Sequence, residues 1–136
     1  MKITKIKPAT KDERGDISDI FYKHPVEHVA IINSKKGVFR GDHYHKFTTQ
    51  HMYMTKGSLR YYYRNVNEGN DKVRSTVVKQ GEMVSTPPNE VHALEILNDN
   101  QFIVFSEGLR GGRDYESDTF RITPSLIKKK EKSLLK

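Results

Sequence analysis

The sequence predicts an all-β sandwich or barrel, and two observations support this fold class. Clusters of turn residues recur about every eight to twelve residues, which is the spacing expected of short strands. No long run of apolar residues at helical spacing occurs before residue 123. At 136 residues, we expect one domain over residues 1–136, with a core of about 15–122 and a basic tail over 123–136.

The predicted strands are apolar or alternating runs bounded by glycine, proline, asparagine or aspartate. In chain order they cover residues 2–6, 17–22, 28–32, 38–45, 50–55, 59–64, 73–78, 83–86, 91–97 and 101–106. The loop 65–71, which reads NVNEGND, is expected to close a hairpin. Proline suits the first turn of a helix, so Pro124 is expected to begin a C-terminal helix. Its apolar residues would be Leu126, Ile127, Leu134 and Leu135.

Composition excludes several classes of protein. The chain has no cysteine, so disulfide and thiolate chemistry are excluded. No apolar run approaches the roughly 20 residues of a membrane span, and the first residues lack a secretory signal, so we expect a cytoplasmic protein that does not bind membranes. Of the net charge of +7, residues 126–136 carry +4 and the rest about +3. This modest charge argues against a nucleic-acid partner and suits a small anionic ligand.

The polar residues that point to function are concentrated near the stretch from Gly37 to Gly57. His43 and His45 are two residues apart, so on a strand both imidazoles face the same side. Gln50 opens the next predicted strand, and His92 follows a proline-rich turn. These side chains can converge in one pocket, either as a metal site or as an acid/base site without metal.

Two motifs built on these residues resemble those of the cupins. Gly37-x5-His43-x-His45-x4-Gln50-x6-Gly57 is similar to the first motif, with glutamine at the usual glutamate position. Gly81-x5-Pro87-x-Asn89-x2-His92 is similar to the second, with asparagine at the usual glycine position. The resemblance implies a small double-stranded β-helix, or jelly roll. It also places His43, His45, Gln50 and His92 at the four ligand positions of a metal-binding cupin.

A shorter stretch, Arg40-Gly41-x-His43-x-His45-Lys46, is similar to the cupins that act on nucleotide-linked sugars. Two branches are similar, the dTDP-4-oxo-6-deoxyglucose 3,4-ketoisomerases and the dTDP-4-dehydrorhamnose 3,5-epimerases. The resemblance implies that His43 removes the proton beside the keto group and that His45 is a second active-site histidine. It assigns Arg14 and Arg40 to the nucleotide diphosphate. Gln50 and Lys46 are further candidates for binding the substrate.

The general acid is left open by the sequence. His45, Gln50 or a barrel tyrosine can face the oxyanion of the enediolate, and alternation points Tyr61 and Tyr63 inward. The tyrosine nearest to the position used by the epimerases is Tyr115. Arg60 and Arg64 are further candidates for an anion-binding rim. The remaining histidines are expected to have structural roles, because His51 alternates outward and His24 and His28 have no partner by spacing.

We therefore expect an isomerase, of the 3,4-ketoisomerase or epimerase type, that acts by proton transfer on a nucleotide-linked 4-keto-6-deoxysugar in polysaccharide or glycan biosynthesis. Such chemistry needs no cofactor, since neutral histidine has a suitable pKa for the base. One alternative is a metal-dependent cupin such as a dioxygenase, holding zinc, iron, manganese or nickel. The other is a sugar-binding cupin without catalysis. We also expect a homodimer, since pairing often covers the sheet edges of small sandwiches.

Overall fold

The computed structural model describes residues 1–108, 114 and 117–127, and the predicted all-β class is confirmed. The strands are β1 (Lys2–Lys5), β2 (Thr10–Asp12), β3 (Gly15–Ile17), β4 (His28–Ser34), β5 (Phe39–Tyr44), β6 (Thr49–Lys56), β7 (Ser58–Asn65), β8 (Arg74–Lys79), β9 (Glu82–Thr86), β10 (Glu90–Ile96), β11 (Asn100–Glu107) and β12 (Phe120–Arg121). A short 3-10 helix, η1 (Asn70–Lys72), lies in the predicted hairpin loop between β7 and β8.

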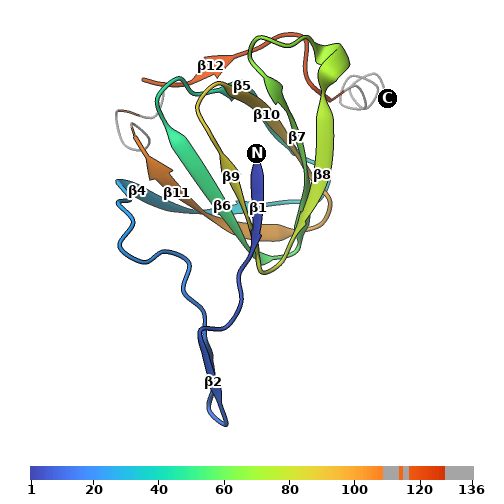
Figure 1. The fold of residues 1–136 in the computed structure, drawn as a ribbon. Helices are drawn as coiled ribbons and strands as arrows, with labels where there is room; N and C mark the ends of the chain where they lie inside the picture. Colours follow the sequence, from blue (N-terminus) through green and yellow to red (C-terminus); the bar gives the residue numbers. More distant parts are fainter. Residues whose placement is uncertain (109–113, 115–116, 128–136) are drawn as a thin grey trace.

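Two antiparallel sheets of five strands face each other and form the predicted jelly roll (Figure 1). The strand order is β1-β9-β6-β11-β4 in one sheet and β12-β5-β10-β7-β8 in the other. Neighbouring strands are often distant in sequence, as in β1 with β9 and β6 with β11. The strands of each sheet are therefore held together mainly by long-range pairing.

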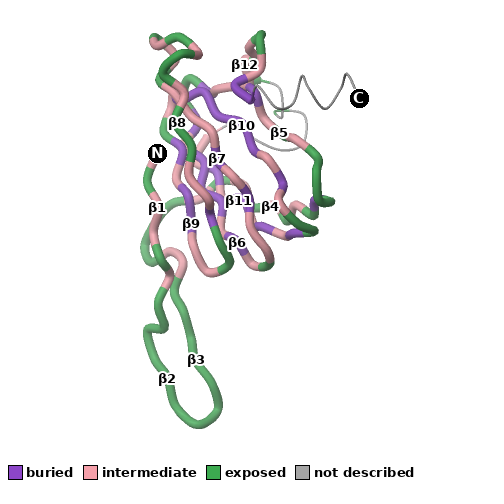
Figure 2. The backbone as a smooth tube through the Cα atoms, turned by 90° about the vertical axis from the view of Figure 1, so that its right-hand side faces the viewer, coloured by how far each residue is buried: buried purple, intermediate pink, exposed green. Residues whose placement is uncertain are grey.

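The main core lies between the sheets, because alternate residues of each strand point inward. Buried side chains from both sheets meet there, including Met54 on β6, Leu59 on β7 and Phe102 on β11. On β10, Leu94 and Ile96 belong to this core, whereas Val91 and Ala93 face the other side. Figure 2 shows how this burial follows the strands of the sandwich.

A smaller core covers the outer face of β10. Leu126 and Ile127 are 4% and 1% exposed and pack with Val91 and Ala93. Pro124 does not begin a helix within the described residues, because the chain bends from residue 123 to 127 to bring these side chains onto the sheet. Leu134 and Leu135, and the rest of the predicted tail from 128, lie outside the described residues.

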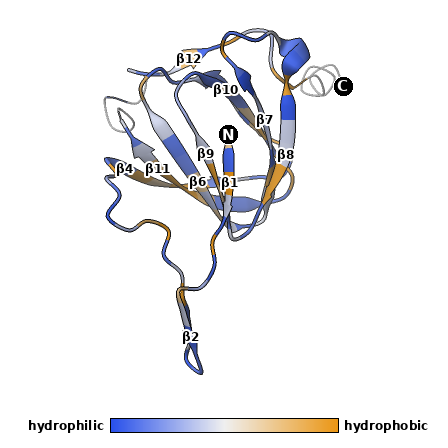
Figure 3. Ribbon diagram, in the orientation of Figure 1, coloured by the Kyte–Doolittle hydropathy of each residue, from blue (hydrophilic) through white to orange (hydrophobic). Residues whose placement is uncertain are grey.

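The N-terminal hairpin of β2 and β3 extends away from the sandwich (Figures 1 and 2). All of its strand residues are exposed, and most of β2 is hydrophilic (Figure 3). The predicted strand over 17–22 is wrong beyond Ile17, because this segment leaves the hairpin and runs toward β4. In the part of the chain that the structure describes, no helix has the length and apolar character needed to cross a bilayer.

A β-bulge interrupts the pairing of β5 with β10. His92 pairs with His43, but the next residue, Ala93, pairs with Gly41, so Asp42 is the extra residue on β5. Gly41 and Asp42 both adopt positive φ, at 89° and 60°. The Asp42 carbonyl accepts a hydrogen bond from Ile122 N at 2.9 Å, and its Oδ1 accepts one from Leu126 N at 3.0 Å. The bulge therefore also holds the segment that follows β12.

We expect Gly41→Ala to destabilise the fold more than Gly37→Ala, a matched control. Both glycines have φ near +90°, so each alanine variant loses about 1–2 kcal/mol to backbone strain. A Cβ on Gly41 would lie 2.8 Å from the His92 carbonyl oxygen, whereas one on Gly37 would meet nothing within 4 Å. Overpacking against backbone should add about 1–3 kcal/mol at Gly41. Urea unfolding measures the free energy of unfolding of both variants. Equal losses of stability in Gly41→Ala and Gly37→Ala would contradict this account of the bulge.

Candidate functional site

Three histidines from two neighbouring strands meet at the inner face of the β5–β10 sheet. His43 lies on β5, His45 immediately follows that strand, and His92 lies on β10 opposite His43. Their ring centroids are 4.7 Å apart for His43 and His92, and 5.0 Å apart for His43 and His45. One nitrogen of each ring lies within 4.8 Å of the others. The predicted convergence of these three residues is therefore found in the structure.

Backbone carbonyls fix the orientation of two of these rings. His45 Nδ1 lies 2.7 Å from the carbonyl oxygen of Asp118, and His92 Nδ1 lies 3.1 Å from that of Glu90. A carbonyl oxygen only accepts, so each Nδ1 must carry the proton and donate it. In a neutral imidazole the basic lone pair is then on Nε2. When neutral, both rings are thus held as Nδ1–H tautomers, and Nε2 is the atom that would take up a proton or bind a metal ion.

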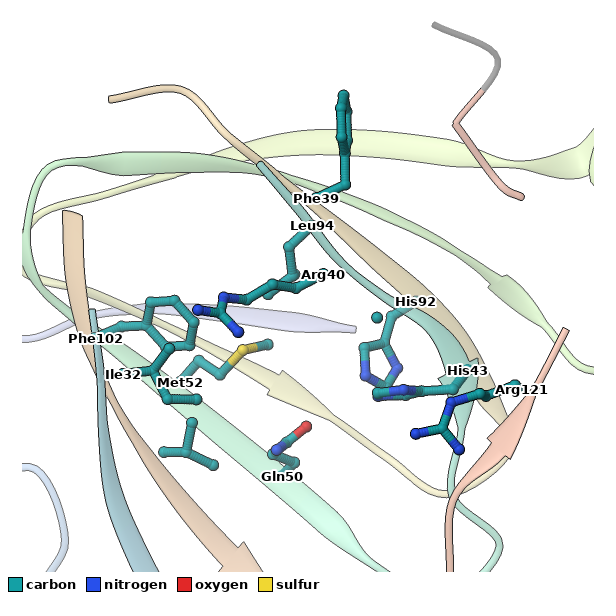
Figure 4. Close-up of a pocket in the computed structure, with 12 residues that line it drawn as sticks. Ile32, Phe39, Arg40, His43, Gln50, Met52, His92, Leu94, Phe102 and Arg121 are labelled. Atoms are coloured by element: carbon teal, nitrogen blue, oxygen red, sulfur yellow. The ribbon is translucent and has the colours of Figure 1, made fainter. Parts of the chain in front are cut away.

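A cavity of about 250 Å³ lies beside His43 and His92. Gln50, 5% exposed, lines it from β6 in the facing sheet, as Figure 4 shows. The rest of the wall is largely apolar and is formed by Ile32, Phe39, Met52, Leu94, Phe102 and Val104. A mostly apolar wall with a few converging polar groups is typical of a small-molecule site.

Two arginines line the same cavity, and both are exposed residues, so they lie where the cavity meets solvent. Arg40 is the predicted one; its Nε donates to Ser34 Oγ at 2.8 Å, and Nη2 donates to the Asn33 carbonyl at 3.3 Å. Sequence reasoning missed Arg121, which pairs in register with His43 from β12. No motif surrounds Arg121, and only the pairing of β12 with β5 brings it to the cavity.

Asp118 holds the loop that follows β5 and was also missed. Its carboxylate accepts hydrogen bonds from the N–H groups of Lys46, Phe47 and Thr48 at 2.8–2.9 Å, and from the Thr48 hydroxyl at 2.9 Å. Burial acts to raise the pKa of Asp118, but these hydrogen bonds outweigh it and hold the pKa below its usual value. The same residue supplies the carbonyl that orients His45.

The two candidate catalytic tyrosines do not line the cavity. Tyr61 and Tyr63 do lie on the same face, but the Tyr61 ring is fully buried and stacks on His92 at 6.0 Å. Its hydroxyl lies 2.5 Å from Thr86 Oγ1 and donates to Glu90 Oε2 at 2.9 Å. Burial, and then the charge of Glu90, raise the pKa of Tyr61 well above its usual value. Tyr61 therefore supports the His92 ring, and of the predicted donors Gln50 is the one whose side chain lines the cavity.

Four predicted anion-binding residues lie outside the cavity lining. Arg14 is on the projecting hairpin, with its side chain 85% exposed and paired to Asp12 at 2.7 Å. Lys46 lies over the Phe120 ring at 4.3 Å. Arg64 donates to carbonyls of its own loop, including Glu68 at 2.7 Å, and Arg60 lies 3.5 Å from Ser75 Oγ. The predicted candidate Tyr115 lies outside the described residues.

A second polar cluster was not predicted. His24 has a partner after all, because its Nε2 lies 2.7 Å from Glu107 Oε2, and His51 Nε2 lies 2.7 Å from the same oxygen. The prediction that His24 has no partner is therefore wrong. Spacing could not reveal this cluster, since its residues come from three separate parts of the chain.

The residues of the first cluster fit a metal ion. Three imidazole nitrogens converge within 4.8 Å, and two of the rings donate Nδ1–H to carbonyl oxygens, as metal-bound histidines commonly do. His43, His45 and His92 would hold the ion, with Gln50 as a neutral oxygen donor from the facing strand. The same donor set also serves as an acid/base site, so the arrangement alone supports both uses.

Comparison with known proteins identifies the family and the fold. The profile of the polysaccharide biosynthesis C-terminal domain matches residues 10–108. No curated protein sequence matches the chain. A 3,4-ketoisomerase from Helicobacter canadensis is 17% identical, with a TM-score of 0.72 over 89% of this chain and 90% of that one.

Two further solved structures have the same fold. A mutant of QdtA, a 3,4-ketoisomerase from Thermoanaerobacterium thermosaccharolyticum, was solved with TDP-4-keto-6-deoxyglucose; it is 17% identical, with a TM-score of 0.71 over 99% of this chain and 96% of that one. The dTDP-4-dehydrorhamnose 3,5-epimerase of Sulfolobus tokodaii is 21% identical, with a TM-score of 0.70 over 87% of this chain and 74% of that one. The predicted resemblance to both branches is confirmed.

We expect Asp118→Asn to lower the free energy of unfolding by about 1–3 kcal/mol at neutral pH, because an amide group replaces an oxygen that accepts hydrogen bonds. The lowered pKa of Asp118 stabilises the fold above the unfolded pKa of about 4, and this stability is lost as pH falls through the folded pKa. The variant should therefore show a flatter decline below about pH 4. Urea unfolding between neutral and acidic pH measures this, with exposed Asp16→Asn as the control. An unchanged acid slope in Asp118→Asn would contradict the assignment.

Proposed function

The chain belongs to the polysaccharide biosynthesis C-terminal domain family, and on that premise we propose that it is a nucleotide-sugar isomerase. Its substrate would be a nucleotide-linked 4-keto-6-deoxysugar, and its reaction would be 3,4-ketoisomerisation or epimerisation by proton transfer. One observation carries the proposal: His43, His45 and His92 meet beside a small cavity that has arginines at its mouth. The solved structures with the same fold support it, since one is a ketoisomerase variant holding TDP-4-keto-6-deoxyglucose.

The histidines provide what proton transfer beside a ketone requires. His43 lines the cavity and is the base that takes the hydrogen from C3. The electron pair of that C–H bond forms the C3–C4 double bond, and the C4 oxygen becomes an oxyanion. Gln50, which lines the cavity, is the donor that stabilises this oxyanion. His45 can donate from Nε2 only as an imidazolium, because the single proton of its neutral ring is already donated from Nδ1 to the Asp118 carbonyl.

Ketoisomerisation is completed when the proton held by His43 is delivered to C4. The O3 hydroxyl loses its proton as C3 becomes the ketone, and the C4 oxygen gains one. One C–H bond and one O–H bond have then moved, so atoms and charge balance. Return of the proton to C3 from the opposite face would instead give an epimer.

The arginines fit the anionic part of the substrate. A cavity of about 250 Å³ is just below the range of about 300–1,000 Å³ typical of drug-sized ligands, so it would hold the sugar ring and leave the diphosphate at the mouth. Arg40 and Arg121 lie there, and guanidinium binds phosphate oxygens well. Since a diphosphate does not cross a bilayer unaided, the proposal includes a cytoplasmic location, where the nucleotide is made.

We expect His43→Asn to slow deuterium uptake from D2O at the carbons next to the keto group while TDP still binds. Asparagine keeps a polar side chain of similar reach but cannot act as a base near neutral pH. Loss of the general base in this variant should slow the exchange of hydrogen for deuterium by about 10²–10⁴-fold. NMR of TDP-4-keto-6-deoxyglucose measures the exchange and also identifies whether C3 or C4 is reprotonated.

Arg40→Ala should show the opposite pattern. Loss of a charged hydrogen-bond donor should weaken TDP binding by about 10–100-fold, from about 1.5–3 kcal/mol, as measured by calorimetry. Arg60→Ala removes the same charge away from the cavity and should bind TDP normally. Exchange at close to the wild-type rate in His43→Asn would rule out His43 as the base.

A metal-dependent cupin enzyme is the second candidate, because the histidine triad also suits a divalent transition metal. A bound ion would supply Lewis-acid chemistry at the cavity, where His43, His45 and His92 would hold it. Elemental analysis of the samples used for exchange distinguishes the two. This candidate would be favoured if the wild-type protein holds about one metal ion per chain and His43→Asn holds none. Deuterium exchange should then also require the ion.

A homodimer is part of the same proposal. β4 is an edge strand with Val29 58% and Ile31 61% exposed, and Ile17 on the hairpin is 65% exposed. Arg14 lies in the turn of that hairpin and does not line the cavity beside the histidine triad, so the nucleotide-binding role implied for it requires the hairpin to dock on a second copy. Light scattering should give twice the mass of one chain, reduced to a monomer in Val29→Asp/Ile31→Asp. A monomeric wild-type protein at micromolar concentration would exclude the dimer.

A further inference from the structure

The second polar cluster lies on the outer face of the β6–β11 sheet. His51 is on β6, Glu107 ends β11, and His24 belongs to the segment between β3 and β4. Both His24 Nε2 and His51 Nε2 lie 2.7 Å from Glu107 Oε2. All three ligand atoms lie within 4.8 Å of one another. Two imidazoles and a carboxylate from three separate elements therefore converge on one point.

The surroundings of the cluster resemble the outer shell of a metal site. His51 Nε2 now donates to the Glu107 carboxylate, and His51 Nδ1 lies 2.7 Å from Ser85 Oγ. If a metal ion takes Nε2, the proton moves to Nδ1 and the serine hydroxyl can accept it. Phe21 stacks on His24 at 4.8 Å and meets His51 edge-on at 5.0 Å. This aromatic ring covers two of the ligands and limits their motion.

The charge of the cluster also suits a cation. Glu107 supplies a carboxylate oxygen and the two histidines supply imidazole nitrogens, so the cluster offers three ligand atoms, one of them on an acidic group.

We propose that His24, His51 and Glu107 form a zinc site that fastens the segment before β4 onto the sheet. Two histidines and a carboxylate are a common ligand set for zinc, with water in the fourth position. The side chains of His24 and Glu107 are 37% and 31% exposed, which leaves room for that water.

The ligands need to move little to accept the ion. Zinc lies about 2.0–2.2 Å from nitrogen and oxygen ligands, so tetrahedral ligands are about 3.4 Å apart. Each imidazole nitrogen, now 2.7 Å from the Glu107 oxygen, must withdraw by under about 1 Å. His24 lies on an irregular, exposed segment, and Glu107 is the last residue of β11 with its side chain 31% exposed, so these two side chains can make the adjustment while the buried His51 stays in place.

This site is distinct from the catalytic cavity. His51 alternates with Gln50 and Met52 along β6, and those two residues line the cavity between the sheets. His24, His51 and Glu107 do not line it. The inference therefore stands or falls independently of the isomerase proposal.

The test compares zinc binding in wild type, His24→Gln and the control His28→Gln. His24 is exposed, so its replacement should leave the fold intact, whereas His28 is a histidine outside both clusters. Calorimetry and elemental analysis should show that His24→Gln binds one zinc ion per chain fewer than wild type. This difference holds whether or not the histidine triad also binds a metal ion, because the triad is unchanged in both proteins. His28→Gln should match wild type, and Glu107→Gln should repeat the loss.

Trypsin cleavage provides a second readout for the fastening role. Lys23 is exposed and immediately precedes His24, so cleavage after Lys23 reports on this segment. Zinc should slow that cleavage at least tenfold in wild type, about 1.4 kcal/mol of local stabilisation, and not in His24→Gln. Cleavage after Arg14 on the hairpin should not respond to zinc.

Two outcomes would overturn the proposal. One is equal zinc content in wild type and His24→Gln. The other is a rate of cleavage after Lys23 that does not change with zinc in the wild-type protein. This result would show that a bound ion does not hold the segment before β4.

Discussion

The pairing of β5 with β10 controls which side chains reach the cavity. Residues three apart on a regular strand face opposite sides, yet Arg40 and His43 both line the cavity. The extra residue at Asp42 reverses the phase of β5, so that Arg40 pairs with Leu94 and His43 pairs with His92 on the same inner face. The glycine at position 41 permits this bulge, because β10 backbone lies where a Cβ would be. One irregular position thus brings a cation and an imidazole to the same site.

The two faces of strand β6 carry chemically different side chains. Gln50 and Met52 face the cavity, whereas His51 between them faces outward toward Glu107 and Ser85. Sheets usually bury one face and leave the other to solvent, but here the segment with Phe21 and His24 covers part of the outer face. The outer face of β6 can therefore hold a polar cluster that is separate from the cavity on its inner face.

Local pattern predicted the features that depend on neighbouring residues. Alternation and turn residues indicated most of the strands, and the two-residue spacing of His43 and His45 put both rings on one side. His92 was added through the second motif, which resembles that of the cupins, and not through its local pattern. Features that depend on distant pairing were not predictable in this way. Arg121 reaches the cavity through β12, Asp118 binds a loop about 70 residues earlier, and His24 meets Glu107 across 83 residues. Tyr61 was placed on the correct face, but its hydroxyl is already bound to Thr86 and Glu90.

The bulge at Asp42 also bears on how the chain can change in evolution. Deleting one residue from β5 would restore regular alternation and turn either Arg40 or His43 away from the cavity. It would also remove the carbonyl and carboxylate that hold the segment after β12. The loop between β7 and β8, by contrast, can gain or lose residues without shifting any strand that lines the cavity. Length variation among related sequences should therefore gather in that loop and be absent from residues 39–45.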